Sequence, residues 1–255
     1  RPHNQRYINI NLLQPETLGL IGERAQPHVV VPLAASAFVA QADPTVFYTV
    51  NLLGTRHLLE ALSTATAPPL CTILAGSANV YGNSDLEVLD ETAATHPAND
   101  YAVSKLAMEY LAKTYMARLG IVITRPFNYT GVGQEPRYLI PKIVSHFKRQ
   151  LPYIELGNTD VAREFSDVRD IARTYRSLAE ALPCGETFNL CSGEATALET
   201  CIRLASEITG HDIEVKVNPD FVKIAEGYYL KARRVTERND LAYAVEEMIK
   251  SNEPY

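Results

Sequence analysis

The chain alternates short, almost purely apolar runs with longer stretches in which apolar residues recur every three to four positions. The apolar runs are 28–36, 69–77 and 120–128. Such runs are typical of parallel strands that are covered on both faces. The stretches between them, 45–64 and 100–119, have the rhythm of amphipathic helices. The pattern therefore predicts alternating strands and helices, which form a doubly wound parallel α/β sheet.

The second of these helices has recognisable ends. Asn99 or Asp100 can cap its first turn, because a short polar side chain can accept a hydrogen bond from a free backbone N–H. Gly120 stands where a helix often ends in a left-handed residue. We therefore expect a helix that begins near residue 100 and ends just before Gly120.

Beyond residue 128 the pattern is less regular. A glycine-containing polar loop comes first, and the elements expected after it are helices at about 137–149, 168–182, 196–209 and 239–250, and strands at 152–156 and 187–192. We expect residues 1–130 to form mainly the parallel-sheet layer. The remaining residues, 131–255, are expected to form mainly a smaller lobe, with the chain crossing back once.

Composition narrows the class of protein. The chain has 255 residues, of which 46% are hydrophobic and 21% charged. A chain of this length can bury roughly 70–75% of its unfolded surface, so it needs no disulfide or metal to hold a core. The formal net charge is −6, with acids and bases mixed along the sequence. Because a phosphate backbone calls for a basic face, nucleic acid is not expected as a partner.

Cysteine and histidine usage argues against a metal site and a disulfide framework. The sequence has no CxxC pair, no HExxH cluster and no histidine at ligand spacing from its four cysteines, Cys71, Cys184, Cys191 and Cys201. They are expected to be reduced thiols in the core of a cytoplasmic protein. The N-terminal residues lack the apolar run of a signal peptide, and no stretch is long enough to span a membrane, so no membrane partner is expected.

Three polar residues fall where the predicted sheet would hold a ligand, at the carboxyl ends of its strands. Ser77 ends the second apolar run, and Tyr101 and Lys105 lie one turn apart at the start of the next helix. A lone tyrosine–lysine pair at this spacing is usually ordinary helix surface. Here, however, a cation would favour the phenolate, and a serine hydroxyl could hold a substrate oxygen beside it. These three residues are therefore candidate catalytic residues for proton transfer that accompanies hydride transfer.

Segments around these residues resemble the extended short-chain dehydrogenase/reductases, the NAD(P)-dependent epimerases, dehydratases and reductases of nucleotide sugars. The similarity runs from about residue 28 to 195 and is carried by VPLAASAFV (31–39), NLLGTRHLLEA (51–61), AGSANVYGN (75–83), YAVSK (101–105), RPFNYTGVGQ (125–134) and LGNTDVAREFSDVRDIA (156–172). The resemblance implies a Rossmann-like dinucleotide-binding domain in 1–130 and a smaller C-terminal lobe in 131–255 that binds the sugar nucleotide.

The resemblance also implies roles for individual residues. It implies NADP(H) or NAD(H) as the cofactor, in contact with Leu33, Ala34, Ala35, Asn51, Tyr101, Lys105, Pro126 and Phe127. It implies a nucleotide-sugar substrate in contact with Ser77, Asn79, Asn128, Gly157, Asn158 and Arg163, to which we add Lys142 because its ammonium could reach a phosphate. It further implies a homodimer that buries parts of 45–64 and 102–119.

Within the family the chain is most similar to the branch that reduces GDP-bound 4-keto-6-deoxy-mannose. The related dehydratases carry a glutamate after the catalytic hydroxyl to remove the C5 proton, whereas this chain has Ala78 and Asn79 there. Dehydration is therefore not expected. Two alternatives stay open: a nucleotide-sugar 4-epimerase that uses the same three residues, and a non-catalytic sensor or interaction protein that lost the dinucleotide site.

The glycine-rich turn that holds the pyrophosphate in this family is not recognisable. The segment Gly19–Ala25 fits GxxGxxA by its letters, but Gln26 and Pro27 would stop any helix before a βαβ unit is complete. We reject it as the turn, and by the resemblance we expect a helix there instead. The first βαβ unit is thus expected to be absent from this chain, either because the sequence is a piece of a longer protein or because the protein lacks the unit.

Overall fold

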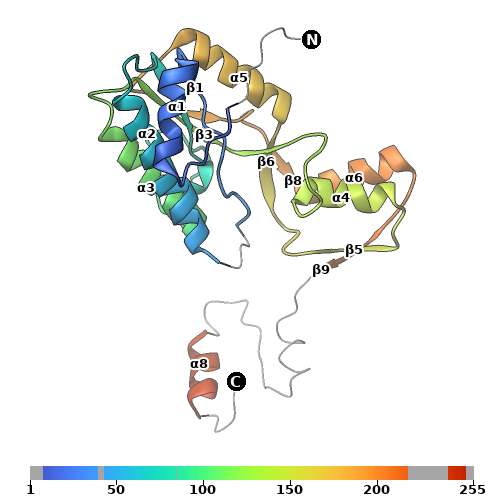
Figure 1. Cartoon of the computed structure of the whole chain (residues 1–255). Coiled ribbons are helices and arrows are strands. Elements are labelled where there is room, and N and C mark those ends of the chain that lie inside the picture. Colours follow the sequence, from blue (N-terminus) through green and yellow to red (C-terminus); the bar gives the residue numbers. More distant parts are fainter. Residues whose placement is uncertain (1–7, 40–42, 85, 218–240, 251–255) are drawn as a thin grey trace. The chain divides into compact units, whose positions relative to one another are not determined.

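The computed structural model describes residues 8–39, 43–84, 86–217 and 241–250 (Figure 1). The chain divides into two compact units, each with its own hydrophobic core. The first unit comprises Arg1–Val132 and Glu164–Ala195, and the second comprises Gly133–Arg163 and Thr196–Tyr255.

The first unit is built on a parallel sheet with the strand order β1-β2-β3-β7. Its strands are β1 (Val29–Val30), β2 (Cys71–Ala75), β3 (Ile121–Pro126) and β7 (Thr187–Leu190). All neighbouring strands pair in parallel, and β3 is buried along its whole length. The doubly wound parallel sheet predicted from the apolar runs is confirmed.

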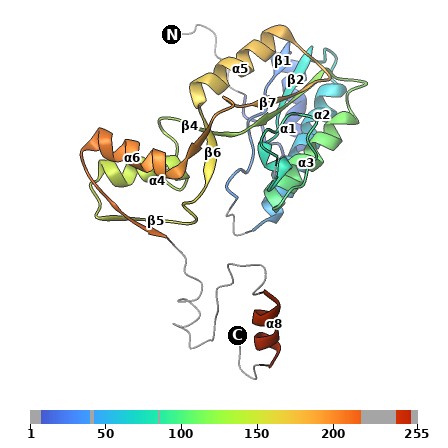
Figure 2. The same ribbon diagram turned by 180° about the vertical axis from the view of Figure 1, so that it is seen from behind.

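Helices cover both faces of this sheet. The helical elements are α1 (Pro15–Leu20), a π-helical turn η1 (Ile21–Ala25), the π-helical η2 (Phe47–Gly54), α2 (Thr55–Ser63), a 3₁₀ turn η3 (Ala78–Tyr81), α3 (Asp100–Lys113) and α5 (Val168–Ala181). Figures 1 and 2 show α1, α2 and α3 on one face and α5 on the other.

The alternation of side chains along the strands explains the two layers, because successive residues of a strand point to opposite faces. Leu74, Ile121 and Ile123 pack with Leu58, Leu59 and Leu62 of α2 and Met108 and Ala112 of α3. Cys71, Ile73 and Val122 form the opposite core, against which Tyr175 and Leu178 of α5 pack. Each apolar run therefore supplies both cores.

The first strand is shorter than the predicted run 28–36, since only Val29 and Val30 pair with β2. Pro32 has no N–H to donate to a ladder. Further along, the backbone N–H and C=O of Ser36 are both bound by the Asn51 side chain, at 2.9 and 3.0 Å. The prediction of a buried strand over 28–36 is therefore wrong in both length and burial: the two paired residues, Val29 and Val30, are half-buried, and Leu33, Ala34 and Ala35 are exposed.

The start of α3 is as predicted and its end is not. The Asn99 side chain accepts a hydrogen bond from the N–H of Ala102 at 2.9 Å, so Asn99 is the cap. The helix ends at Lys113, and Gly120 does not have a positive φ. Glycine is required at 120 for a different reason: a Cβ there would lie 2.3 Å from the carbonyl oxygen of Leu70 and 2.7 Å from Cys184 Sγ.

The segment Gly19–Ala25 is helical, since it runs from α1 into η1. The segment does not form a strand–turn–helix, which agrees with the prediction that it is a helix and not the pyrophosphate-binding turn. None of the helices in the part of the chain that the structure describes has the length and apolarity that a membrane crossing requires.

The second unit contains α4 (Leu139–Lys148), β5 (Tyr153–Leu156), α6 (Leu198–Thr209), β9 (Glu214–Val217) and α8 (Leu241–Lys250). The strands β5 and β9 pair in parallel. Its core consists of Ile143, Phe147, Ile154, Leu156 and Leu198. The helices and the strand at 152–156 agree with the sequence pattern, apart from residues 239 and 240, which lie outside the described residues.

Three short strands follow the main sheet: β4 (Asn128–Thr130), β6 (Ala162–Asp167) and β8 (Ala195–Ala197), in the order β4-β6-β8. After β6 the chain returns to the first unit, because β7 pairs with β3. The compact units therefore differ from a single division at residue 130 by the segment Glu164–Ala195. What each unit binds remains a prediction.

Candidate active site

Ser77 lies two residues beyond the last residue of β2, at the carboxyl edge of the sheet. Its extended backbone, with φ −168°, places it at the start of η3. Its Oγ accepts a hydrogen bond from the N–H of Asn79 at 3.2 Å, and only 7% of the residue is exposed. The turn thus holds a serine hydroxyl where a parallel sheet binds ligands.

Lys105 joins α3 to the same strand end. Its Nζ donates a hydrogen bond to the carbonyl oxygen of Ala75 at 2.7 Å, two residues before Ser77. Only 4% of the residue is exposed. Burial lowers its pKa to about 8, since removal from water disfavours the ammonium. Lys105 is therefore still mostly a cation at neutral pH and loses its charge around pH 8.

Tyr101 lies one turn before Lys105 on the same face of α3. The Lys105 Nζ is 5.9 Å from the centroid of its ring. On another side the ring meets Phe47 edge to face, at 5.7 Å between centroids. Only 9% of Tyr101 is exposed, so apolar packing fixes the ring beside the ammonium. The structure thus brings Tyr101 and Lys105 together next to the strand end that leads into Ser77.

Asn51, predicted to contact the cofactor, has its amide engaged within the protein. Besides its two bonds to the backbone of Ser36, its Nδ2 donates to Ser104 Oγ at 3.1 Å. Ser104 in turn donates to the carbonyl oxygen of Tyr101 at 2.7 Å. Asn51 therefore ties the segment after β1 to the helix that carries Tyr101.

The other predicted cofactor residues follow β1 and β3. Leu33, Ala34 and Ala35 are exposed, and 68% of Leu33 is accessible. Pro126 is the buried last residue of β3, and the N–H of Phe127 donates to the carbonyl oxygen of Leu190 at 3.0 Å. An exposed apolar segment at the carboxyl edge of a parallel sheet fits the flat ring of a dinucleotide.

The predicted substrate residues are divided between the two units. Asn79 and Asn128 are exposed residues of the first unit, and Asn128 Nδ2 donates to the carbonyl oxygen of Glu164 at 3.2 Å. Four belong to the second unit: Lys142, Gly157, Asn158 and Arg163. Lys142 donates to the carbonyl oxygen of Glu155, and Arg163 to that of Ala162. That the two groups meet at one ligand stays a prediction.

A buried polar network behind Ser77 was missed by sequence reasoning. Arg125 Nη2 donates to Glu109 Oε2 at 2.7 Å and Nε to Oε1 at 3.0 Å. Arg125 Nη1 donates to the Tyr81 hydroxyl at 2.9 Å, and that hydroxyl donates to Asn189 Oδ1 at 2.7 Å. Burial alone would lower the pKa of Arg125, but its hydrogen bonds to Glu109 and Tyr81 outweigh burial and raise it.

Two signals in the sequence could have revealed this network. Arg125 is a charged residue inside the apolar run 120–128. Glu109 continues the spacing of Tyr101 and Lys105 by one more turn, so the three share one helix face. A charge at a position that the pattern buries requires a partner, because an isolated buried ion is very costly.

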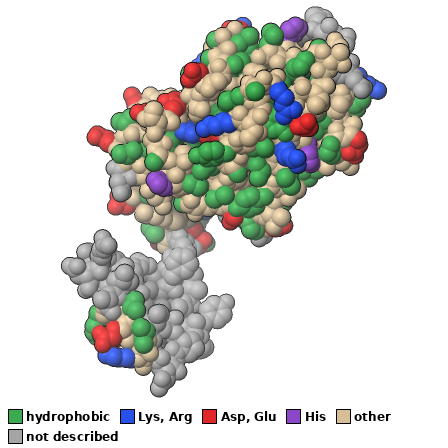
Figure 3. Space-filling view, turned by 90° about the vertical axis from the view of Figure 1, so that its left-hand side faces the viewer, with side chains coloured by type: hydrophobic (Ala, Val, Ile, Leu, Met, Phe, Trp, Pro, Cys, Tyr) green, Lys and Arg blue, Asp and Glu red, His purple; other side chains and the backbone are tan. Residues whose placement is uncertain are grey.

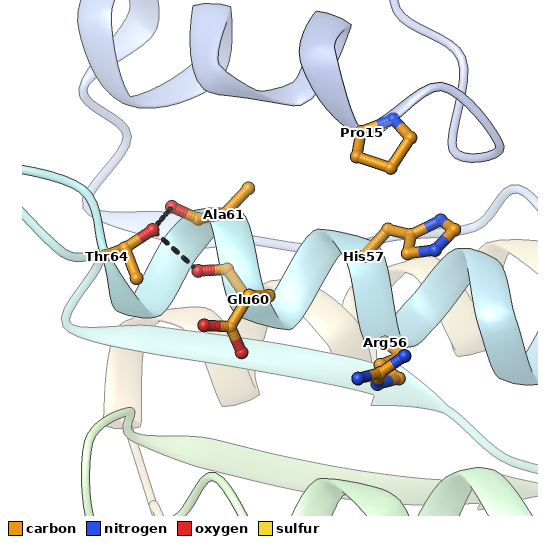
Figure 4. A pocket seen from close by; sticks show the side chains of 6 residues that line it. All are labelled: Pro15, Arg56, His57, Glu60, Ala61 and Thr64. Carbon is orange, nitrogen blue, oxygen red and sulfur yellow. Dashed lines mark hydrogen bonds between the residues drawn. The ribbon is translucent and has the colours of Figure 1, made fainter.

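A hollow on another part of the first unit contains none of the predicted site residues. It lies between α1 and α2 and is lined by Pro15, Arg56, His57, Glu60, Ala61 and Thr64 (Figure 4). Its acidic group already has partners, since Glu60 accepts from the Tyr115 hydroxyl at 3.0 Å and lies 3.8 Å from Arg118. The carboxyl edge of the sheet is therefore the better candidate for chemistry.

Comparison with known proteins agrees with the fold. Residues 1–191 match the model of the NAD dependent epimerase/dehydratase family. GDP-6-deoxy-D-talose 4-dehydrogenase of Aggregatibacter actinomycetemcomitans is 35% identical over 84% of this chain and 73% of its own length. GDP-6-deoxy-D-mannose reductase of Pseudomonas aeruginosa is 33% identical over 85% of this chain and 74% of its own.

A solved structure from the same group gives the same result. RMD from Pseudomonas aeruginosa, complexed with NADPH, superimposes with a TM-score of 0.78 at 29% identity and covers 92% of this chain and 85% of that one. Fold and site thus define an NAD(P)-dependent oxidoreductase. More narrowly, the chain belongs to the NAD dependent epimerase/dehydratase family, the extended short-chain dehydrogenase/reductases, as its motifs led us to expect.

Proposed function

We propose that this protein reduces the C4 ketone of a nucleotide-bound 4-keto-6-deoxy-hexose, with GDP as the nucleotide and NADPH or NADH as the reductant. The observation that carries the proposal is the placement of Ser77, Tyr101 and Lys105 around the carboxyl end of β2. The names of two relatives, which both refer to GDP-linked 6-deoxy sugars, support the substrate class.

The chain's own residues would carry the proton and hold the ketone. Tyr101 donates its phenolic proton to the C4 oxygen, so that the ketone becomes an alcohol as hydride reaches carbon. Ser77 Oγ accepts from Asn79 in the structure, and its own hydrogen can be donated to the same C4 oxygen. Lys105 places a positive charge beside the phenol and stabilises the phenolate that remains. The dinucleotide supplies the hydride when it is bound.

The remaining assignments follow from this reaction. Leu33, Ala34, Ala35, Pro126 and Phe127 would line the dinucleotide. Asn51 would act by holding Ser36, which directly follows the segment 33–35. Asn79 and Asn128 would contact the sugar. From the second unit, the diphosphate and nucleotide would be bound by Lys142, Gly157, Asn158 and Arg163, two of which carry the positive charge that phosphate attracts.

The test is turnover of the full-length protein with a GDP-linked 4-keto-6-deoxy-hexose, followed by NADPH absorbance. Tyr101→Phe should lose at least about 10²-fold in kcat, because the proton donor is gone. Tyr110→Phe is the matched control, since Tyr110 is an exposed tyrosine of the same helix (60% accessible). Tyr101→Phe with activity near wild type would overturn the assignment.

The same assay separates the alternatives. Interconversion of two nucleotide sugars without net NADPH consumption would indicate a 4-epimerase. Absence of cofactor binding in the full-length protein would indicate a sensor or interaction protein. The two relatives are named for sugars of opposite configuration at C4, talose and mannose. Proton spectra of the product therefore tell which face of C4 receives hydride.

We further propose a cytoplasmic homodimer formed through η2, α2 and α3. Figure 3 views the side on which α2 and α3 lie in Figure 1, and hydrophobic side chains are spread over it. Leu53, Val103 and Tyr110 are exposed hydrophobic residues of these elements, with 43%, 38% and 60% accessible. Light scattering of wild type and of Val103→Asp should show a dimer and a monomer respectively; a monomeric wild type would overturn the proposal.

A further inference from the structure

The backbone at Ala75, Gly76 and Ser77 is held at each residue by a different element of the fold. The carbonyl oxygen of Ala75 accepts from Lys105 Nζ at 2.7 Å. The N–H of Gly76 donates to the carbonyl oxygen of Thr124 at 2.7 Å. Ser77 begins the turn η3, whose last residue is Tyr81. The position of the Ser77 hydroxyl therefore depends on α3, β3 and η3 together.

The carboxylate of Glu109 packs directly against this strand end. A Cβ built on Gly76 would lie 3.1 Å from Glu109 Oε1, so the carboxylate rests on the backbone next to Ser77. Glu109 lies one turn after Lys105 on α3, and Arg125 follows Thr124 on β3. Glu109 and Arg125 thus connect the helix of the tyrosine and lysine with the strand that holds Gly76.

Tyr81 closes the connection on the side of the serine. Its hydroxyl accepts from Arg125 Nη1 at 2.9 Å, and the guanidinium lies 5.0 Å from its ring centroid. Tyr81 has no exposed surface, and Asn189 accepts from its hydroxyl. Through Tyr81, the ion pair fixes the far end of the turn that begins at Ser77.

Stability alone is a poor reason for this arrangement. Glu109 and Arg125 are 2% and 7% exposed, and a buried ion pair often stabilises a fold no better than apolar residues of similar volume. What the pair does supply is a fixed orientation of α3 relative to β3, because a guanidinium that donates two parallel hydrogen bonds restricts how helix and strand can be placed. Such a fixed orientation is needed where the side chains of Ser77, Tyr101 and Lys105 must act on one oxygen atom.

We propose that Glu109, Arg125 and Tyr81 are positioning residues, which set the Ser77 hydroxyl relative to Tyr101 and Lys105. They touch neither cofactor nor substrate and act through the segment 75–77. The inference rests on the proposed reduction for its kinetic consequence, while the geometry of 75–81 can be measured without any substrate.

The main test replaces the pair by apolar residues of similar size, Glu109→Leu together with Arg125→Met. Such a replacement preserves the packing volume and avoids an unpaired buried charge. The melting temperature should stay close to that of wild type. The kcat should fall by about 10- to 100-fold, because displacing a reacting group by about 1 Å has an effect of that order. The KM values for sugar nucleotide and cofactor should change by less than about threefold, since binding contacts are retained.

The matched control is Arg176→Met together with Glu180→Leu. This pair lies on α5 with an N–O distance of 2.8 Å, but its side chains are 80% and 64% exposed. The control should leave kcat unchanged. Tyr81→Phe removes only the hydroxyl of the network and should lower kcat by about three- to tenfold. It should also lower the melting temperature moderately, because Arg125 Nη1 and Asn189 Oδ1 lose that partner.

A double variant with the kcat of wild type would overturn the inference. If that variant does not fold, Tyr81→Phe decides, and an unchanged kcat there overturns it equally. If conditions that restore the stability of the double variant also restored its kcat to the same extent, the inference would be overturned as well. A purely structural pair would behave in that way.

Amide hydrogen exchange provides the readout that does not depend on the substrate. In both network variants the amides of residues 76–82 should exchange at least about tenfold faster, while those of α5, which contributes no residue to the network, keep their protection. If wild type fails to reduce the sugar nucleotide, the proposed function fails, and exchange still decides the positioning role. Unchanged exchange over 76–82 would overturn that role.

Discussion

The two edges of the parallel sheet in the first unit are built in opposite ways. The carboxyl edge has three buried charged side chains, those of Lys105, Glu109 and Arg125. At the amino edge the chain approaches itself closely around Gly120 and Cys71. Burial, helped by a hydrogen bond with Cys184, raises the pKa of Cys71 to about 12, so its thiol stays neutral.

The difference shows how one small sheet separates stability from chemistry. Close packing at the amino edge depends on volume and is indifferent to the direction of any one bond. The carboxyl edge depends on the direction of hydrogen bonds, which is what holds a proton donor in place. Substitutions at the amino edge should therefore change stability, and substitutions at the carboxyl edge should change kcat.

The largest effect is expected from Lys105→Met. It should lower kcat/KM by about 10²- to 10⁴-fold, because the cation beside Tyr101 is lost. The melting temperature should change little, since removal of a desolvated ammonium offsets the hydrogen bond lost at Ala75. Steady-state kinetics and thermal unfolding of the same sample measure both.

Lys113→Met is the control for that variant. Lys113 belongs to the same helix, is exposed, and lies near Tyr110 instead of Tyr101. It should change neither quantity. A Lys105→Met protein that keeps its activity would remove the distinction between the two edges.

The same substitution, glycine to alanine, can be made at each edge of the sheet, at Gly76 and at Gly120. A Cβ at Gly76 would lie 2.5 Å from the carbonyl oxygen of Thr124, and one at Gly120 would lie 2.3 Å from that of Leu70. Because the clashes are similar, Gly76→Ala and Gly120→Ala should each reduce the free energy of unfolding by about 1–3 kcal/mol. Only Gly76→Ala should also lower kcat, by at least about tenfold, since only it displaces Ser77.

Denaturant unfolding and single-turnover kinetics of the two variants check this prediction. Equal losses of kcat in both, at temperatures where both are folded, would show that the amino edge also controls the geometry of the site.

A smaller effect is expected from Asn51→Ala, which removes the bonds to Ser36 and Ser104. Freed from Asn51, the exposed segment 33–35 has more conformations to lose when it meets the cofactor, so the Kd for the dinucleotide should rise about tenfold, or ~1.4 kcal/mol. Titration calorimetry gives the Kd. Thr49→Ala, on the same helical element η2, should leave it unchanged, and a Kd unaffected by Asn51→Ala would show that the segment does not meet the cofactor.

Near neutral pH the smallest effect is a pH dependence set by Lys105, because most of its ammonium is still protonated there. Its folded-state pKa of about 8 lies below the ordinary lysine value of 10.5. Between these values the unfolded chain holds a proton that the folded chain has released, so this group makes stability rise with pH over that window. Activity should move the other way and fall above about pH 8, as the cation is lost. A kcat/KM profile flat from pH 7 to 10 would contradict this.

Much of the first unit could be predicted from local pattern. The runs that became β2 and β3 are apolar on both faces. Asn99 caps the helix that the periodicity of 100–119 predicts. The spacing of Tyr101 and Lys105 places both on one face of a helix whatever lies opposite. Residues near one another in sequence, or on one periodic element, can be related without knowledge of the fold.

Other features could not be predicted, because they depend on segments far apart in the chain. The role of Gly120 is set by Leu70 and Cys184, and the backbone of Ser36 is bound by Asn51, 15 residues further along the chain. Likewise, the segment 164–195 joins the first unit only because β7 finds a place beside β3.

The sequence by itself determined the class of fold and the family, and it named three candidate residues for an acid/base site, since these follow from periodicity and from motifs that are continuous in the chain. Only the tertiary structure decided what holds that site in place. Glu109 and Arg125 are 16 residues apart in the sequence, and Tyr81 and Asn189 are 108 residues apart. Hydrogen bonds between such residues form only when packing has brought their elements within about 3 Å, and no local pattern encodes that distance.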